Sequence, residues 1–111
     1  MNLEDGLLVR IYIGEQDRYE DEPMHQWLLT AAHQQGIAGA SVLRGLEGYG
    51  AEGRLHTARV LRLSTDLPLV IEMVDQPDKI EAFLKIVDGA LEQGLVTVEK
   101  VRMKAFSKAG D

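Results

Sequence analysis

Alternation of apolar and polar positions along four stretches of the chain predicts four β-strands. The first stretch, residues 6–14, is bounded by glycines and contains several β-branched residues, which favour strands. The second covers roughly residues 40–48. The third covers residues 68–75, where Pro68 stands at the start and removes only an outer hydrogen-bond donor. The fourth stretch, residues 95–106, is predicted to be a long last strand.

The apolar positions change parity within the fourth stretch. Val96 and Val98 are even-numbered, whereas Val101 and Met103 are odd-numbered. One extra residue in a strand reverses the faces of all later side chains, as a β-bulge does. We therefore expect a bulge near residues 99–100.

A different spacing, with apolar residues three and four positions apart, predicts two amphipathic helices. The first begins at Pro23, which suits a first helical position, and ends near Gly36, a favourable C-terminal cap. The second begins at Pro77 and stops at Gly94. The expected buried stripes are Met24, Trp27, Leu28, Ala31 and Ala32 in the first helix, and Ile80, Phe83, Leu84, Val87 and Leu91 in the second.

The predicted order is βαββαβ, which is typical of a ferredoxin-like sandwich, an α+β fold. We expect a single domain over residues 1–111, with a four-stranded antiparallel sheet and both helices on one face. The other face is expected to be apolar too, because Leu8 and Tyr12 point away from Val9 on the first strand. A sheet that is apolar on both sides needs cover on both sides. We therefore predict that other copies of the chain cover the second face.

Composition narrows the functional classes. The chain has 111 residues, of which 45% are hydrophobic, enough for one compact core. It has no apolar run of about 18 residues, so we expect no direct membrane insertion. The net charge of −6 argues against nucleic acid as a partner. The absence of cysteine excludes disulfides and thiolate metal sites and fits a cytoplasmic protein.

Residues 48–53 spell G-x-G-x-x-G, and three interpretations of this loop are open. A dinucleotide-binding turn requires a helix directly after it, but residues 54–59 carry no apolar helical stripe. In the second interpretation, the glycines form the flexible root of a long loop, since glycine tolerates positive φ. In the third, free backbone N–H groups of the turn cradle an anion.

Polar side chains offer further candidates. Arg102 and Lys104 share one face of the last strand, where they serve either as surface charges on an edge or as a phosphate clamp. His25 and His33 are too far apart on their helix for a direct metal pair, and His56 lies in the loop. No serine or threonine has a recognisable histidine and aspartate pair, so we expect no enzymatic activity.

Three segments give the chain a resemblance to the PII-like signalling proteins, in particular to their small, functionally obscure branch. They are residues 39–50 (GASVLRGLEGYG), 66–72 (DLPLVIE) and 94–99 (GLVTVE). The resemblance spans residues 7–106 and implies a ferredoxin-like homotrimer whose sheets face its interior. It also implies a T-loop-like segment at about residues 50–65 and a nucleotide site in the clefts between subunits.

The same resemblance carries over to individual positions. Gly48-Tyr49-Gly50 is similar to the Gly-Phe-Gly at the T-loop root of PII regulators. Glu52 stands where those regulators have a glutamine, and Leu95 replaces a phosphate-pairing lysine. The ligand-binding residues expected from the resemblance, together with the basic residues of the loop, are Gly48, Tyr49, Gly50, Arg54, His56, Gly94, Arg102 and Lys104.

The leading hypothesis is a non-enzymatic, trimeric sensor that binds a small anionic ligand, with an adenine nucleotide as the candidate. Its long loop is expected to signal to a partner, and the candidate partners are a transporter, a channel or a regulatory protein. The alternative is a metal-responsive trimer resembling the divalent-cation tolerance proteins. That alternative uses His25, His33 or His56 with nearby carboxylates.

Overall fold

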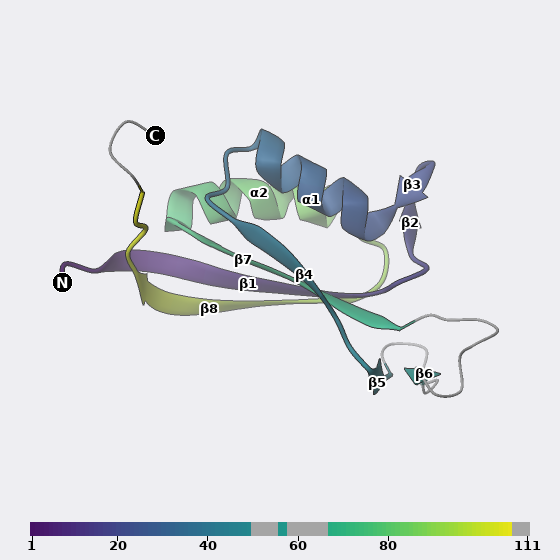
Figure 1. The fold of residues 1–111 in the computed structure, drawn as a ribbon. Coiled ribbons are helices and arrows are strands. Elements are labelled where there is room, and N and C mark those ends of the chain that lie inside the picture. Colours follow the sequence, from purple (N-terminus) through teal and green to yellow (C-terminus); the bar gives the residue numbers. More distant parts are fainter. Residues whose placement is uncertain (50–55, 58–66, 108–111) are drawn as a thin grey trace.

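A four-stranded antiparallel sheet in the order β4–β7–β1–β8 is the main element of the molecule (Figure 1). The computed structural model describes residues 1–49, 56–57 and 67–107, with the backbone alone at 56–57. The sheet strands are β1 (Glu4–Gly14), β4 (Ala40–Arg44), β7 (Pro68–Asp75) and β8 (Leu95–Met103). The helices α1 (Met24–Gln34) and α2 (Pro77–Ala90) cover one face (Figure 1). The predicted α+β, ferredoxin-like fold is thereby confirmed.

The strand register assigns each side chain to a face, because residues directly opposite each other project from the same side. Val9 of β1 pairs with Met73 of β7, and Ile11 pairs with Ile71. All four are buried beneath the helices. The alternate residues therefore form the face that the helices leave uncovered, which we call the open face.

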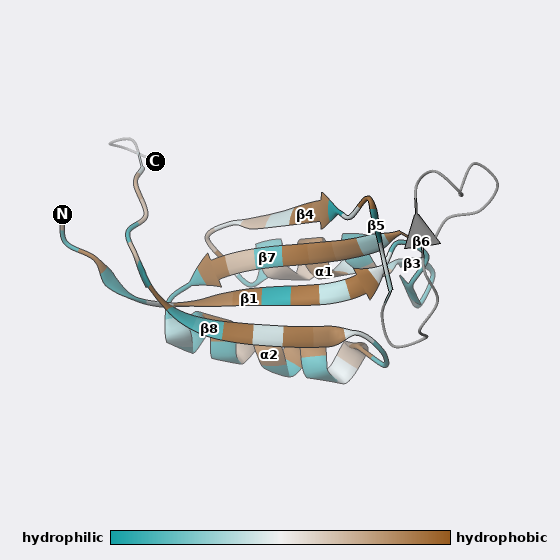
Figure 2. Cartoon of the chain, turned by 90° about the horizontal axis from the view of Figure 1, so that it is seen from below, coloured by the Kyte–Doolittle hydropathy of each residue, from teal (hydrophilic) through white to brown (hydrophobic). Residues whose placement is uncertain are grey.

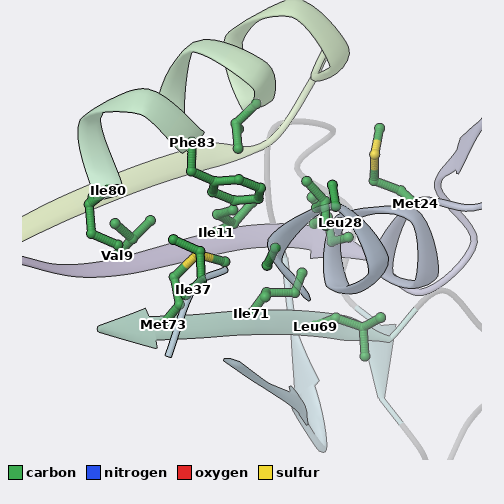
Figure 3. Packing of buried hydrophobic residues seen from close by; sticks show 14 residues of the cluster. Val9, Ile11, Met24, Leu28, Ile37, Leu69, Ile71, Met73, Ile80 and Phe83 are labelled. Atoms are coloured by element: carbon green, nitrogen blue, oxygen red, sulfur yellow. The ribbon is translucent and has the colours of Figure 1, made fainter. Parts of the chain in front are cut away.

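The core lies between the sheet and the two helices (Figure 3). Phe83 and Ile80 of α2 reach toward β1, while Leu28 of α1 reaches the same layer from the neighbouring helix (Figure 3). None of these three side chains has exposed surface. Burying a side chain of this size contributes roughly 1.5–3 kcal/mol, so the helices are held mainly by these contacts.

The predicted helical stripes are mostly confirmed. Met24, Leu28, Ala31 and Ala32 are buried in α1, as are Ile80, Phe83 and Val87 in α2. Trp27, Leu84 and Leu91 are only partly buried and pack against the edge of the core. The helix boundaries also differ: Pro23 precedes α1 as its N-cap, and α2 ends at Ala90. Gly36 and Gly94 follow the helices with positive φ, at 75° and 117°.

The predicted bulge in β8 is wrong. Pairing with β1 is continuous along the whole of β8, which ends at Met103 rather than at residue 106. The change of parity has another cause, because the environment changes along a regular strand. Val98 and Lys100 project from the helix-covered side but are exposed, whereas Val101 is partly buried on the open face.

Two short hairpins were not expected from the sequence. The predicted second strand divides into β4 and β5 (Glu47–Gly48), and β5 pairs with β6 (His56–Thr57). The polar connection before α1 contains β2 (Arg18–Tyr19) paired with β3 (Glu22–Pro23). This hairpin is attached to α1 by the rings of Tyr19 and Trp27, whose centroids are 4.4 Å apart.

The sheet has two different ends. At one end, which we call the loop end, β4 runs toward β5 and β7 begins. The N- and C-terminal segments both lie at the opposite end (Figure 1). In the described part of the chain, neither helix has the length and apolar character needed to cross a membrane.

Candidate functional site

A row of apolar side chains crosses the open face near the loop end. Leu43, Val70, Tyr12 and Leu95 are paired in that order across the four strands. Leu43 is 49% exposed and Leu95 is 58% exposed. Figure 2 views the sheet from this side, with the helices behind it. The row is therefore a hydrophobic strip that no described element of the chain covers.

A charged network lies next to this row. Arg10 of β1 donates to the Glu72 carboxylate at 2.9 Å and to the Glu99 carboxylate at 2.5 Å. The hydrogen bonds to Glu72 and Glu99 raise the pKa of Arg10 above its ordinary value, although desolvation opposes this. The guanidinium therefore stays charged, and the network carries one more negative than positive charge on a face that is otherwise largely apolar.

At the loop end, the chain leaving β4 is held against Pro68. The backbone N–H of Gly45 donates to the Pro68 carbonyl at 2.7 Å. A Cβ at Gly45 would lie 2.7 Å from the Pro68 ring, and one at Gly48 would lie 3.2 Å from it. Glycine is therefore required by close packing at Gly45 and favoured at Gly48, so these residues fix how the loop leaves the sheet.

An ion pair joins the last residue of β4 to the end of β1. The Arg44 guanidinium lies 2.5 Å from the Glu15 carboxylate. The Glu15 backbone N–H also donates to the Leu67 carbonyl at 2.8 Å, just before β7 begins. The pair was not predicted from the sequence, because the two residues are far apart in the chain and no motif links them. It ties three strands together at the loop end.

Gly94 lies at the same end but beside the other edge strand. Its φ is 117°, and a Cβ there would lie 2.5 Å from the Tyr12 carbonyl oxygen. Only glycine fits this position, because both the conformation and the space exclude a side chain. The structure thus places Gly48 and Gly94 at one end of the sheet, with Gly48 against Pro68 of β7 and Gly94 against Tyr12 of β1.

Arg102 and Lys104 lie at the other end. Arg102 donates to the Leu3 carbonyl at 2.9 Å and lies 3.7 Å from the Asp5 carboxylate. Its position is seven residues along β8 from Leu95, which corresponds to about 23 Å. Lys104 follows the end of β8, and its ammonium lies 5.6 Å from the Phe106 ring. Within one chain, these two basic residues do not meet the glycines of the loop end.

The remaining predicted ligand-binding residues belong to the loop. Tyr49 is exposed directly after β5. Gly50 and Arg54 lie outside the described residues, as does most of the T-loop-like segment at 50–65. Of His56, the structure describes only the backbone, which pairs with Gly48. The loop half of the predicted site therefore stays a prediction.

A surface cleft of about 440 Å³ separates the β2–β3 hairpin from the loop after α2. Asp17 crosses one side of it by accepting hydrogen bonds from the Gly14 N–H and the Gln93 side chain, at 3.0 and 3.1 Å. Glu20 and Glu92 also line the cleft. These carboxylates make it a poor place for an anion, since like charges repel.

The metal alternative receives no support from the described residues. Within residues 1–49 and 67–107, no group of three or more potential ligands is placed to hold a metal ion. His33 is exposed and His25 is partly buried on α1. The third histidine of that hypothesis, His56, has no described side chain.

Comparison with known proteins identifies the family. The sequence model of DUF190, described as "Uncharacterized ACR, COG1993", matches residues 6–103. The chain belongs to the DUF190 family. A UPF0166 protein of Aquifex aeolicus is 34% identical over 96 residues, covering 86% of this chain and 90% of that protein. UPF0166 protein MJ1524 of Methanocaldococcus jannaschii is 34% identical over 92 residues, covering 82% and 84%.

Solved structures share the fold of this DUF190 protein at low sequence identity. CPII, a nitrogen regulatory PII-like protein from Thiomonas intermedia K12 solved with ADP, AMP and bicarbonate, has a TM-score of 0.69 and 14% identity. The match covers 94% of this chain and all of that one. A putative PII-like signaling protein from Thermus thermophilus has a TM-score of 0.68 and 16% identity, covering 93% of each chain. The predicted resemblance to PII-like signalling proteins is confirmed at the level of fold.

Proposed function

We propose that this protein is a cytoplasmic, non-enzymatic sensor that works as a homotrimer of the PII-like kind. It binds a small anionic ligand, an adenine nucleotide, in the clefts between subunits. The ligand changes the surface of the segment at residues 50–65, and a partner protein reads that surface. The candidate partners are a transporter, a channel or a regulatory protein.

The observation that carries this proposal is the apolar row on the open face. Leu43, Val70, Tyr12 and Leu95 form a strip across all four strands, and no element of the described chain covers it. Contiguous exposed apolar surface of this kind marks an interaction site. Copies of the same chain supply matching apolar strips, and their association removes the surface from water.

The separation of Gly48 from Gly94 favours a site that is shared between subunits. Gly48 packs on Pro68 of β7, whereas Gly94 lies against the Tyr12 carbonyl beside β8, so each is held by a different strand. When copies pack through their sheets, the β4 edge of one copy can approach the β8 edge of another. The loop root of one chain and Gly94 of the next then come together without any change within a chain.

The ligand class is supported by a fold neighbour. CPII was solved with ADP, AMP and bicarbonate, all of which are anions. The loop end of the present protein offers Arg44 as a cation among the described residues, 64% exposed at its side chain. The cleft beside β2 and β3 is lined by Asp17, Glu20 and Glu92 together with Arg18, so its carboxylates outnumber its cation and an anion is expected beside Arg44 instead.

Self-association is tested by placing a charge in the apolar row. Leu43→Asp buries a carboxylate in the proposed interface, and a buried unpaired charge is strongly unfavourable. We expect sedimentation velocity to show a trimer for the wild type and a smaller species for this variant. Leu46→Asp is the matched control, since Leu46 lies in the loop and is 79% exposed. A monomeric wild type, or identical behaviour of the two variants, would contradict the proposal.

Ligand binding is tested by calorimetry with ADP, AMP, ATP and bicarbonate. We expect heat with at least one of them and an affinity that weakens as salt is added, because the ligand is anionic. The stoichiometry links ligand binding to self-association. If the ligand binds in clefts shared by two subunits, one ligand binds per chain only in the assembled trimer. The absence of heat with all four compounds would remove the ligand assignment while leaving the assembly intact.

A further inference from the structure

We infer that Arg44 is the anion-binding residue of the loop end, and that Glu15 is a built-in competitor which occupies it when no ligand is bound. This inference rests on the proposed function, because it concerns the same site. It also changes which cation serves the site. Arg102 and Lys104 were expected from the sequence to hold the anion, whereas Arg44 is the last residue of β4, directly before the loop root.

The position of Arg44 couples it directly to the loop. Arg44 ends β4 opposite Leu69, and the next residue is Gly45, whose N–H is held by the Pro68 carbonyl. A guanidinium movement at Arg44 therefore acts on the first residue of the segment that leads to Gly48. Arginine suits this role, because its planar donor fork binds oxyanions through two parallel hydrogen bonds.

The burial of the two partners is unequal. The Arg44 side chain is 64% exposed, whereas the Glu15 side chain is 18% exposed. The guanidinium can thus be reached from solvent while its carboxylate partner stays in place at the end of β1. An incoming phosphate or carboxylate oxygen meets the same guanidinium with which Glu15 now forms an ion pair.

The pair is weak enough for a ligand to replace. A partly exposed ion pair favours its paired state over the unpaired state by at most about fivefold, because water screens the two charges. Charge-assisted hydrogen bonds to a bound anion are worth about tenfold to a hundredfold, since both partners leave water more completely. A ligand anion can therefore displace Glu15 from Arg44. This displacement breaks the ion pair that connects the end of β1 to the loop root.

Orthophosphate is the probe for this inference. It is titrated at constant ionic strength while the Nε–Hε resonance of Arg44 and the amide resonance of Gly45 are followed by NMR. We expect both to shift with one saturating curve. The Nε–Hε resonance of Arg18 is the internal control, because that arginine is exposed and donates to the Asp21 carbonyl within its own hairpin rather than facing Glu15.

Three single variants then distinguish competition between Glu15 and phosphate for Arg44 from a purely structural role of the ion pair. Glu15→Gln is expected to tighten phosphate binding about two- to fivefold, because the competitor loses its charge. Arg44→Gln is expected to weaken binding at least about tenfold. Glu47→Gln removes the same charge from the loop root without touching the pair, so it should change the affinity less than Glu15→Gln. When Glu15→Gln is combined with Arg44→Gln, the increase in phosphate affinity caused by Glu15→Gln should disappear. The reason is that Arg44, for which Glu15 and phosphate compete, is then absent.

The outcomes are decisive in both directions. Unshifted resonances of Arg44, or equal shifts at Arg18, overturn the inference even if nucleotides bind elsewhere. Equal gains from Glu15→Gln and Glu47→Gln also overturn it, because the effect is then general electrostatics. If the calorimetric panel gives no heat but phosphate still shifts Arg44 in competition with Glu15, the proposed nucleotide function fails and this inference stands. If Glu15→Gln does not fold, Glu15→Asp, which retracts the carboxylate, gives the same test.

Discussion

Replacement of Gly94 by alanine should be among the most damaging small substitutions in the chain. Two costs add at this position. A φ of 117° is sparsely populated by residues with a side chain, which costs about 1–3 kcal/mol. The new Cβ would also lie 2.5 Å from the Tyr12 carbonyl oxygen, and relieving such a clash by backbone movement costs about 1–3 kcal/mol. The expected loss is therefore about 2–6 kcal/mol, a large part of a small domain's stability.

Two other glycines provide matched controls. Gly36 has a positive φ of 75° but open space around a Cβ, so Gly36→Ala should cost only the conformational part, about 1–2 kcal/mol. Gly89 lies in α2, also with open space, and Gly89→Ala should stabilise the protein by about 0.5–1 kcal/mol. The three substitutions add the same methyl group, so their order isolates conformation and crowding from size.

The assay is urea unfolding followed by circular dichroism, at one fixed protein concentration because self-association shifts apparent stability. The slope m should be the same for all three variants, so that midpoints report stability. If Gly94→Ala cost no more than Gly36→Ala, the crowding against Tyr12 would be refuted. If it cost less than about 1 kcal/mol, the whole account of Gly94 as a position restricted to glycine would fail.

Further predictions concern four other positions, namely Leu28, Leu84, Asp75 and Gly50. Leu28→Ala should cost about 2–5 kcal/mol and the partly buried Leu84→Ala about 1–2 kcal/mol in urea unfolding; a reversed order would mean that the helix faces are misassigned. Asp75→Ala should cost about 2–4 kcal/mol by the same measurement, because its carboxylate accepts from the N–H groups of Ala38 and Gln76; Asp75→Asn should cost less, and equal losses would contradict this. Gly50→Val should impair the ligand response in calorimetry without unfolding the protein, and native affinity would count against a role at the loop root.

The helices and the inner strands could be predicted from the sequence. In both, one side is buried, so the alternation of a strand and the three-to-four spacing of a helix are clear in the apolar residues. β7 was predicted with its observed bounds, since its buried residues alternate without interruption. β8 misled the prediction, because it is an edge strand and its helix-covered side becomes polar at Lys100. A change of environment along a regular strand gives the same letters as a bulge.

The candidate site was harder to predict. Positions where glycine is required, such as Gly94, stand out because only one residue type fits them. Pairs such as Glu15 with Arg44 do not, because their meeting depends on how β1, β4 and β7 end side by side. A charged residue next to a turn looks the same in sequence whether it is solvated or paired, so only the register reveals the partner. For the same reason, the sequence did not reveal that Arg102 lies at the end of the sheet opposite the loop end.

The central place of β1 in the sheet has a consequence for how the protein is made. β1 leaves the ribosome well before its partners β7 and β8, because α1 and β4 are synthesised in between. Contacts such as Arg10 with Glu99 join distant parts of the chain, which raises contact order and slows folding. Until β7 has been synthesised, the apolar residues of β1 have no sheet to enter, so the nascent chain is expected to depend on helper proteins that shield such segments.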